Sequence, residues 1–283
     1  MRRLPRSFLA AAGLLVLGGS YLGADVLRRN ASHEREWIAA QSRLPVVRTD
    51  GDIVRISDIR DFRHAPDGTS EERWTQDEFD VTQLERVWFA LSPFEPRFEG
   101  IAHPFLTFEF ADGRTVAISV EARREVGEEY SPLLGLLRRY ETMVVIGTEA
   151  DLLGLRVIAW DDPLYLFPVR VTAAQAQHLF RRLIDDAARI EQIPMWYNTL
   201  TNNCTSTIID AINELAAADD ALGPLVGVLP GYSLEAVYER GWIDTDLSLE
   251  ETRRMHYANE RIAAAIGDPD FSRAIRAYVS GDS

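Results

Sequence analysis

The sequence predicts an α+β fold in which an antiparallel sheet packs on helices. Three observations support this prediction. Short runs of β-branched and aromatic residues separated by turn residues come first, apolar residues at helical spacing come last, and no second domain boundary is visible after residue 47. Of the 283 residues, 46% are hydrophobic and 10% are aromatic, so the chain holds enough apolar surface for a packed core.

A β-hairpin is the clearest strand signal. Residues 105–110 and 115–120 are rich in aromatic and β-branched side chains and flank Asp112-Gly113, a combination typical of a hairpin turn. The polar stretch 61–77, which contains Pro66-Asp67-Gly68, is predicted as a long turn region. Shorter β-rich runs predict further strands at residues 53–56, 143–146 and 165–169.

Helices are predicted in the later part of the chain. Residues 173–191 carry apolar side chains at helical spacing, with charged side chains on the opposite face. Cys204 is predicted to open the next helix, because isoleucines follow it at helical spacing and two asparagines that can cap a helix precede it. A last helix is predicted over residues 249–266.

The N-terminal region indicates an exported protein. Residues 8–27 contain one charged side chain, Asp25, and arginines stand on both sides of this stretch. The pattern is typical of a membrane anchor, with a cleaved signal peptide as the alternative. Both interpretations place the body outside the cytoplasm, because the basic flank stays inside. The predicted organisation is an anchor or signal peptide at 1–29, a linker at 30–46 and one domain at 47–270.

Charge and composition exclude several classes of function. The formal net charge is −14, so the protein repels nucleic acid. All 30 basic residues are arginine, which excludes the lysine of a phosphate-binding P-loop and Schiff-base catalysis. The single cysteine excludes an intrachain disulfide and a cysteine-based zinc module. No metal-ligand cluster or nucleotide motif is visible, so we expect no cofactor and no metal.

Cys204 is the candidate nucleophile. At the start of a helix its sulfur would face unpaired backbone N–H groups and the positive end of the helix dipole. That environment lowers the pKa of a thiol and provides donors for an oxyanion. The alternative is an inert, buried structural cysteine.

His103 is the candidate base. It stands before a predicted strand in Ala102-His103-Pro104, where a rigid sheet can hold the ring. His64 belongs to the polar turn region. His33 lies beside the predicted membrane segment, and His178 and His256 lie off the apolar faces of their helices, so these three are predicted at the surface.

These motifs resemble a known family. His103-Pro104-Phe105-Leu106-Thr107-Phe108, the stretch 119–125 and Tyr197-Asn198-Thr199-Leu200-Thr201-Asn202-Asn203-Cys204-Thr205 are similar to the N-terminal periplasmic domain of the lipoprotein N-acyltransferase Lnb. The order of histidine and cysteine also resembles the circularly permuted papain-like superfamily with NlpC/P60 relatives. The resemblance implies a permuted papain-like fold, a Cys204–His103 pair, and a body in the periplasm beside the inner membrane.

A third polar group would orient the imidazole, and Glu121 is the candidate. A three-residue hairpin loop at 111–113 would place Glu121 directly opposite His103. A two-residue loop would place Glu121 on the other face of the sheet, and the sequence does not decide between them. Asn203 and Thr205 are expected to position the sulfur and the oxyanion, and Tyr197 is either an oxyanion donor or a buried aromatic.

The expected reaction is covalent thiol catalysis. The resemblance implies that Cys204 takes an acyl chain from a phospholipid and passes it to the amine of a lipoprotein. Residues 133–139 and 225–229 are leucine-rich and are candidate membrane contacts or core segments. The alternatives are an envelope cysteine peptidase or amidase with the same residue pair, and a noncatalytic envelope module with a structural cysteine.

Overall fold

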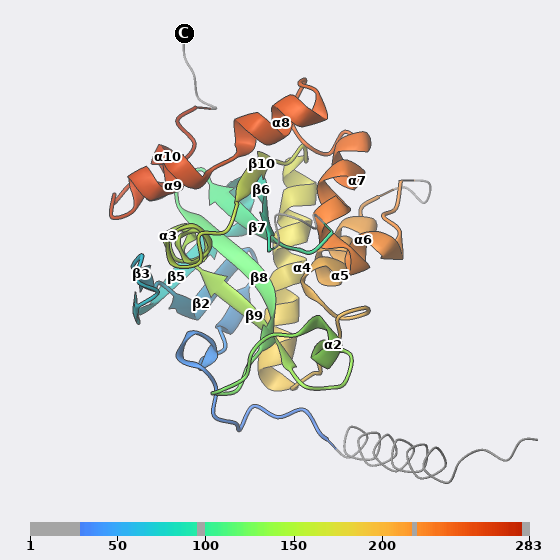
Figure 1. Cartoon of the computed structure of the whole chain (residues 1–283). Helices are drawn as coiled ribbons and strands as arrows, with labels where there is room; N and C mark the ends of the chain where they lie inside the picture. Colours follow the sequence, from blue (N-terminus) through green and yellow to red (C-terminus); the bar gives the residue numbers. More distant parts are fainter. Residues whose placement is uncertain (1–28, 95–99, 217–219, 279–283) are drawn as a thin grey trace, which may run out of the picture.

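A mixed sheet forms the centre of the protein (Figure 1). The computed structural model of the chain describes residues 29–94, 100–216 and 220–278. The strand order is β1-β2-β9-β8-β7-β6-β10, and β5 pairs with β2 beside this path. The strands are β1 (Val46–Asp50), β2 (Ile53–Arg60), β5 (Trp74–Asp80), β6 (Leu84–Pro93), β7 (Ala102–Phe110), β8 (Thr115–Arg123), β9 (Glu141–Gly147) and β10 (Tyr165–Pro168).

The sheet is not purely antiparallel, which corrects the prediction. β2 and β9 pair in parallel at Arg60 and Gly147, whereas the neighbouring strands pair antiparallel. A separate two-stranded ribbon of β3 (Arg63–His64) and β4 (Ser70–Glu71) lies within the stretch predicted as a turn region. Together with β5, it makes that stretch more ordered than its polar composition indicates.

Helices cover both faces of the sheet (Figure 1). The long amphipathic helix α4 (Ala173–Gln192) and α5 (Cys204–Asn213) pack on one face, and α3 (Glu149–Gly154) with α9 (Asn259–Ala265) and α10 (Phe271–Ala274) lies on the other. The remaining helices are α2 (Pro132–Gly135), α6 (Pro224–Val228), α7 (Ser233–Glu239) and α8 (Leu249–His256). The predicted last helix is two helices, since the chain breaks its helical path at Tyr257 and Ala258.

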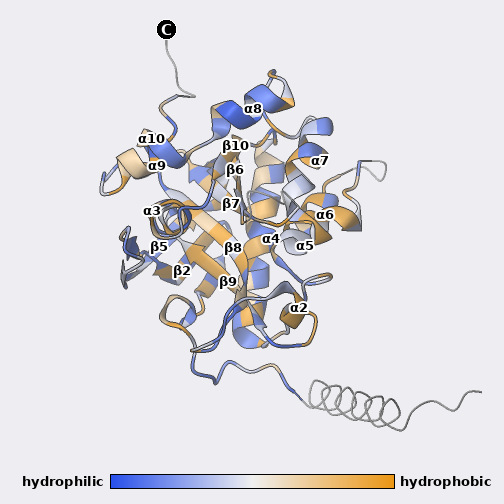
Figure 2. Ribbon diagram, in the orientation of Figure 1, coloured by the Kyte–Doolittle hydropathy of each residue, from blue (hydrophilic) through white to orange (hydrophobic). Residues whose placement is uncertain are grey.

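Strand alternation divides the core into two halves. On β7, Leu106 and Phe108 belong to the half under α4 and α5, and Phe105 belongs to the half under α3 and α9. This follows from the two-residue period of a strand, which turns successive side chains to opposite faces. Figure 2 shows β8 and β9 as hydrophobic and the outer helix α8 as hydrophilic, as expected for a sheet buried on both sides.

The hairpin of β7 and β8 has the three-residue loop. Phe110 N–H donates to Arg114 O, and Leu106 pairs with Ile118. Beyond that pair the two strands separate, because β7 continues along β6 down to Ala102 while β8 continues along β9 up to Arg123. The sheet is therefore split at this end, and residues on the two sides of the split line a cavity.

The segment predicted as a linker, residues 30–46, lies against the body in its described part. Trp37 bridges to Glu125, and Gln41 is buried with its amide hydrogen-bonded to Glu121. The predicted anchor, residues 8–27, lies outside the described residues. Within the described ranges, no helix has the length and apolar character needed to cross a bilayer.

Candidate functional site

The first turn of α5 is held by Asn203. Its side-chain Oδ1 accepts the backbone N–H groups of Thr205 and Ser206, both at 2.8 Å. Its Nδ2 donates to Thr199 O at 2.7 Å and to Gly227 O at 3.0 Å. Asn203 therefore acts as the helix cap predicted from the sequence, and its amide has no donor left for an oxyanion.

Cys204 is the first residue of α5 and is buried, with 7% of its surface exposed. Burial raises the pKa of its thiol to about 11, although contacts with Thr205 and the charge of Arg156 act in the opposite direction. The predicted lowering of this pKa is wrong for a physical reason. Asn203 Oδ1 accepts the N–H groups of residues 205 and 206, and desolvation of the thiolate outweighs the hydrogen bonds from Thr205 and the charge of Arg156.

Hydrogen-bond donors lie near the sulfur. The Thr205 hydroxyl lies 3.6 Å from Cys204 Sγ. The backbone N–H of Cys204 has no hydrogen-bond partner among the described residues. Thr205 therefore contacts the sulfur, and the Cys204 amide is a backbone donor that could bind an oxyanion.

His103 lies on β7 at the split in the sheet. Its Nε2 is 2.7 Å from Ser119 Oγ, and Ser119 Oγ in turn donates to Glu121 Oε1 at 3.2 Å. Since the Ser119 hydrogen goes to a carboxylate, Nε2 carries a hydrogen and donates to Ser119, which leaves Nδ1 as an acceptor. Burial and the positive charge of Arg156 lower the pKa of His103 to about 3, so the ring is neutral at neutral pH.

Glu121 does not contact His103 directly, which corrects the predicted arrangement. The register is the one that sets these residues opposite each other, but β7 and β8 separate before reaching them. Ser119 fills the gap between the imidazole and the carboxylate. Burial opposes ionisation of Glu121, yet the charge of Arg60 and a hydrogen bond from Gln41 at 3.1 Å help to hold its pKa below the usual value.

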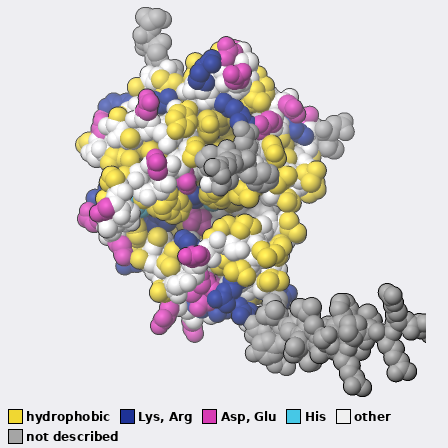
Figure 3. All heavy atoms as spheres, in the orientation of Figure 1, with side chains coloured by type: hydrophobic (Ala, Val, Ile, Leu, Met, Phe, Trp, Pro, Cys, Tyr) yellow, Lys and Arg dark blue, Asp and Glu magenta, His cyan; other side chains and the backbone are white. Residues whose placement is uncertain are grey.

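One cavity joins these groups. It has a volume of about 320 Å³. Figure 3 shows a hollow near the middle of this face of the molecule, bordered by hydrophobic side chains. The cavity brings together the predicted residues from β7, β8, α5 and the loop before α5, and its lining includes Cys204, His103, Glu121, Asn203 and Tyr197. Thr205 lines a second cavity instead.

Arg156 is a site residue that sequence reasoning missed. It is 6% exposed, lines the same cavity, and lies within η3 (Leu155–Ala159), a turn of π-helix that follows α3. Its guanidinium lies over the ring of Trp160 at 4.5 Å and 3.8 Å from the carboxylate of Asp162. π-Helical turns are frequent at functional sites, but an isolated arginine in an apolar run gives no sequence signal of its burial.

Tyr197 is a buried aromatic with a hydroxyl close to the site. Its ring packs in a small cluster with Tyr140 and Ala122, and its hydroxyl is 3.4 Å from that of Tyr130. Burial raises the pKa of Tyr197 well above its usual value. The phenol is therefore a neutral donor at the cavity wall, and both predicted roles are compatible with its position.

The other histidines lie elsewhere. His256 corrects a prediction, because it is 3% exposed, stands near Leu166 O and the Tyr278 hydroxyl, and its pKa is lowered by burial to about 4. His178 is half-buried, with 39% of its side chain exposed, and pairs with Glu214, as a surface residue does. No three histidine, cysteine or acidic side chains gather as a metal site within the described part of the chain.

The fold and the cavity define an α+β domain with one thiol at a helix start. The family model of the Lnb N-terminal periplasmic domain matches residues 70–228. This match covers more than half of the chain, so the protein belongs to the Lnb N-terminal periplasmic domain family and its body is a periplasmic part of the cell envelope. No curated protein and no solved structure matches the chain.

Proposed function

We propose that this protein is a thiol acyltransferase of the periplasm that moves an acyl chain from a phospholipid to an amine through Cys204. The observation that carries the proposal is the single cavity lined by Cys204 and His103, with Ser119 and Glu121 behind the imidazole. Membership of the Lnb domain family supports a lipoprotein amine as the acceptor.

The first half-reaction forms a thioester. His103 Nδ1 takes the thiol proton as Cys204 Sγ attacks the ester carbonyl, and the carbonyl oxygen becomes an oxyanion. The carbon–oxygen bond then breaks, and His103 returns the proton to the departing lysophospholipid alcohol. Because burial disfavours a separated thiolate and imidazolium, proton transfer accompanies the attack. The Ser119–Glu121 chain stabilises the imidazolium while it lasts.

The oxyanion needs a donor or a cation. The backbone N–H of Cys204 and the buried guanidinium of Arg156 supply both at the cavity. A charge that develops in a dry site interacts strongly with such preorganised groups. Arg156 lowers the pKa of the thiol and of His103, and this effect indicates that its field reaches both reacting groups.

The second half-reaction forms an amide. The neutral amine attacks the thioester carbonyl, its proton passes to His103, and the carbon–sulfur bond breaks. Cys204 then recovers the proton from His103, which restores the starting state. Water as acceptor in place of the amine would make the same site a hydrolase.

Exposed leucines favour a lipid substrate. Leu133 in α2 is 68% exposed and Leu225 in α6 is 74% exposed, so these two leucines are not core residues. Figure 2 shows both helices as hydrophobic. Pro132 and Val228, from the same helices, line the cavity. A bilayer touching these leucines would lie at the entrance of the site, and an anchor at residues 8–27 would keep the domain there.

The arrangement also supports a permuted papain-like architecture. A cysteine opens a helix, that helix packs against β7 and β8, and the histidine comes earlier in the chain on β7. Two observations favour the alternative of a noncatalytic module with a structural cysteine: the thiol is buried, and its hydrogen-bond partner is Thr205 and not His103.

The test is mass spectrometry of the full chain after incubation with phospholipid in detergent. We expect an acyl adduct on Cys204 that hydroxylamine removes. Addition of a diacylated lipopeptide should transfer the acyl group from Cys204 to the lipopeptide amine. His103→Gln should abolish the adduct. The matched change His178→Gln, at the half-buried histidine that pairs with Glu214 and lies outside the cavity, should leave it intact.

Other outcomes identify the alternatives. Turnover of amide substrates with no acyl adduct would make the protein a hydrolase. Activity that persists in Cys204→Ala would show that Cys204 is not the nucleophile. That result, or a folded wild-type chain with no activity, would favour the noncatalytic module with a structural cysteine.

A further inference from the structure

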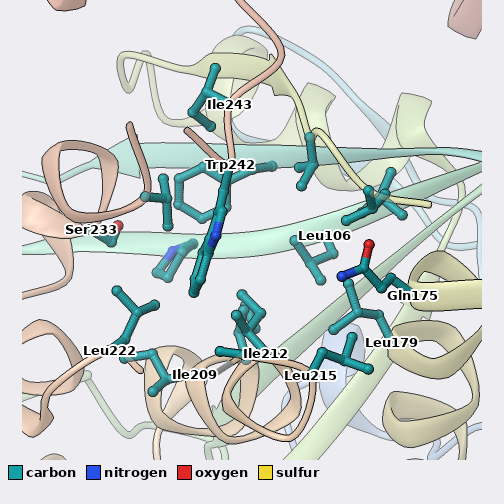
Figure 4. A pocket seen from close by; sticks show the side chains of 18 of the residues that line it. Leu106, Gln175, Leu179, Ile209, Ile212, Leu215, Leu222, Ser233, Trp242 and Ile243 are labelled. Atoms are coloured by element: carbon teal, nitrogen blue, oxygen red, sulfur yellow. The ribbon is translucent and has the colours of Figure 1, made fainter. Parts of the chain in front are cut away.

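A second cavity lies near Cys204, because the next residue, Thr205, is part of its lining, and most of the side chains that line it are apolar. It has a volume of about 220 Å³ and lies between α4, α5, α7 and the strands β6 and β7. Figure 4 shows Leu106 of β7, Ile212 of α5 and Trp242 of the segment after α7 projecting into it. Polar groups occur at few positions of its wall. An apolar cavity as small as about 150 Å³ takes up benzene, so this one has room for part of an aliphatic chain.

The two cavities share one wall at the reacting residues. On β7, His103 faces the first cavity and Pro104 the second. On α5, Cys204 lines the first cavity, while Thr205 lines the second with its hydroxyl 3.6 Å from the sulfur. Thr205 therefore contacts the sulfur and lines the second cavity at the same time.

The same pattern repeats on α6. Val226 lines the second cavity, and the next residue, Gly227, lines the first. Gly227 O also receives a hydrogen bond from Asn203, the cap of the thiol helix. The end of the apolar cavity is thus formed by the elements that hold Cys204 in place.

We infer that this second cavity binds the aliphatic chain of the acyl group carried on Cys204. The inference rests on the proposed acyl transfer and adds where the chain goes. A thioester at Sγ needs an apolar volume next to the sulfur, and the chain enters that volume past the Thr205 side chain. The wall offers valine, leucine and isoleucine side chains and an indole, which suits a saturated hydrocarbon tail better than a polar or peptidic group.

The dependence of binding affinity on the length of the fatty-acid chain tests this inference. Each buried methylene contributes about 0.8 kcal/mol, which is about a fourfold gain in affinity. We therefore expect the affinity of Cys204→Ala for fatty acids to rise by about fourfold per methylene from butanoate to octanoate, and to level off once the cavity is full. Displacement of a fluorescent fatty acid measures this series without any turnover.

Variants that fill the cavity complete the test. Val226→Phe and Ile212→Phe place larger side chains at half-buried positions of the wall, and we expect each to weaken dodecanoate binding by at least about tenfold. Val126→Phe is the matched control, because Val126 is 66% exposed and lines neither cavity. Circular dichroism confirms that each variant is folded before it is compared.

The outcomes separate this inference from the proposed function. Chain-length-dependent binding that the two filling variants reduce, and the control does not, supports an aliphatic-chain site in the second cavity. If no adduct forms on Cys204 in the same preparation, the acyl transfer is refuted while this binding site stands. An adduct whose rate is the same for acetyl and dodecanoyl esters, with fatty-acid binding unaffected by both filling variants, would refute the cavity assignment and leave the acyl transfer standing.

Discussion

The protonation state of Cys204 gives the sharpest test of the site. Burial raises the pKa of this thiol to about 11, against 9.0 for an ordinary cysteine. A difference of about two pKa units corresponds to about 2.7 kcal/mol between the protonated and ionised forms. At neutral pH the folded protein therefore holds about a hundredfold less thiolate than a free cysteine does.

This shift has a definite effect on stability. Below about pH 9 the thiol is protonated in the folded and unfolded chains, and its contribution is fully present. Between about pH 9 and pH 11 the unfolded chain loses the proton while the folded chain keeps it. The free energy of unfolding falls by up to about 2.7 kcal/mol over this window. Cys204→Ser removes this part of the slope, so the difference between the two proteins isolates it.

The assay is the rate of iodoacetamide alkylation as a function of pH, followed by intact mass. We expect wild-type alkylation to be at least about a hundredfold slower than that of a free cysteine near neutral pH. Arg156→Gln removes a positive charge that lowers this pKa, so it should move the alkylation curve to higher pH. A thiol pKa at or below 9, or an Arg156→Gln curve that coincides with the wild type, would refute this account of the site.

Two further predictions concern stability. Asn203→Ala removes a helix cap and leaves the carbonyls of Thr199 and Gly227 without their donor, so we expect a loss of about 3–5 kcal/mol and a fall of about 10 °C in melting temperature. Ser248→Ala removes an exposed cap on α8 and should cost about 1 kcal/mol; equal losses would contradict the special role of Asn203. His256 is buried with its pKa lowered to about 4, so stability in urea should fall as pH drops from about 6.5 to 4, because the unfolded chain takes up a proton that the folded chain does not. His256→Gln should flatten that decline, and an unchanged slope would rule the mechanism out.

Local patterns in the sequence identified the elements that carry the predicted site. The Asp112-Gly113 hairpin, the amphipathic helix α4 and the helix that starts at Cys204 are all present. Each depends on interactions among neighbouring residues, such as the cap that Asn203 gives to α5. The strand β6 was missed, although it pairs with both β7 and β10, because a strand buried on both faces lacks the alternation that marks a half-exposed one.

The hairpin pattern predicts the pairing register of β7 and β8 but not where the two strands separate. The sequence left two loop lengths open, and the structure has the three-residue loop. That register alone would set His103 against Glu121. The separation of β7 and β8 beyond Leu106 depends on what each strand pairs with on its other side, and no property of the hairpin itself determines it.

The sequence by itself determined the thiol, its place at the start of a capped helix and the strand that carries the histidine, because these depend on residues close together in the chain. Only the tertiary structure decided the electrostatics. Burial raises the pKa of Cys204 and lowers that of His103, and Arg156 reaches both from a π-helical turn far away in sequence. Desolvation depends on everything packed around a group, so the local motif Asn203-Cys204-Thr205 carries no information about it.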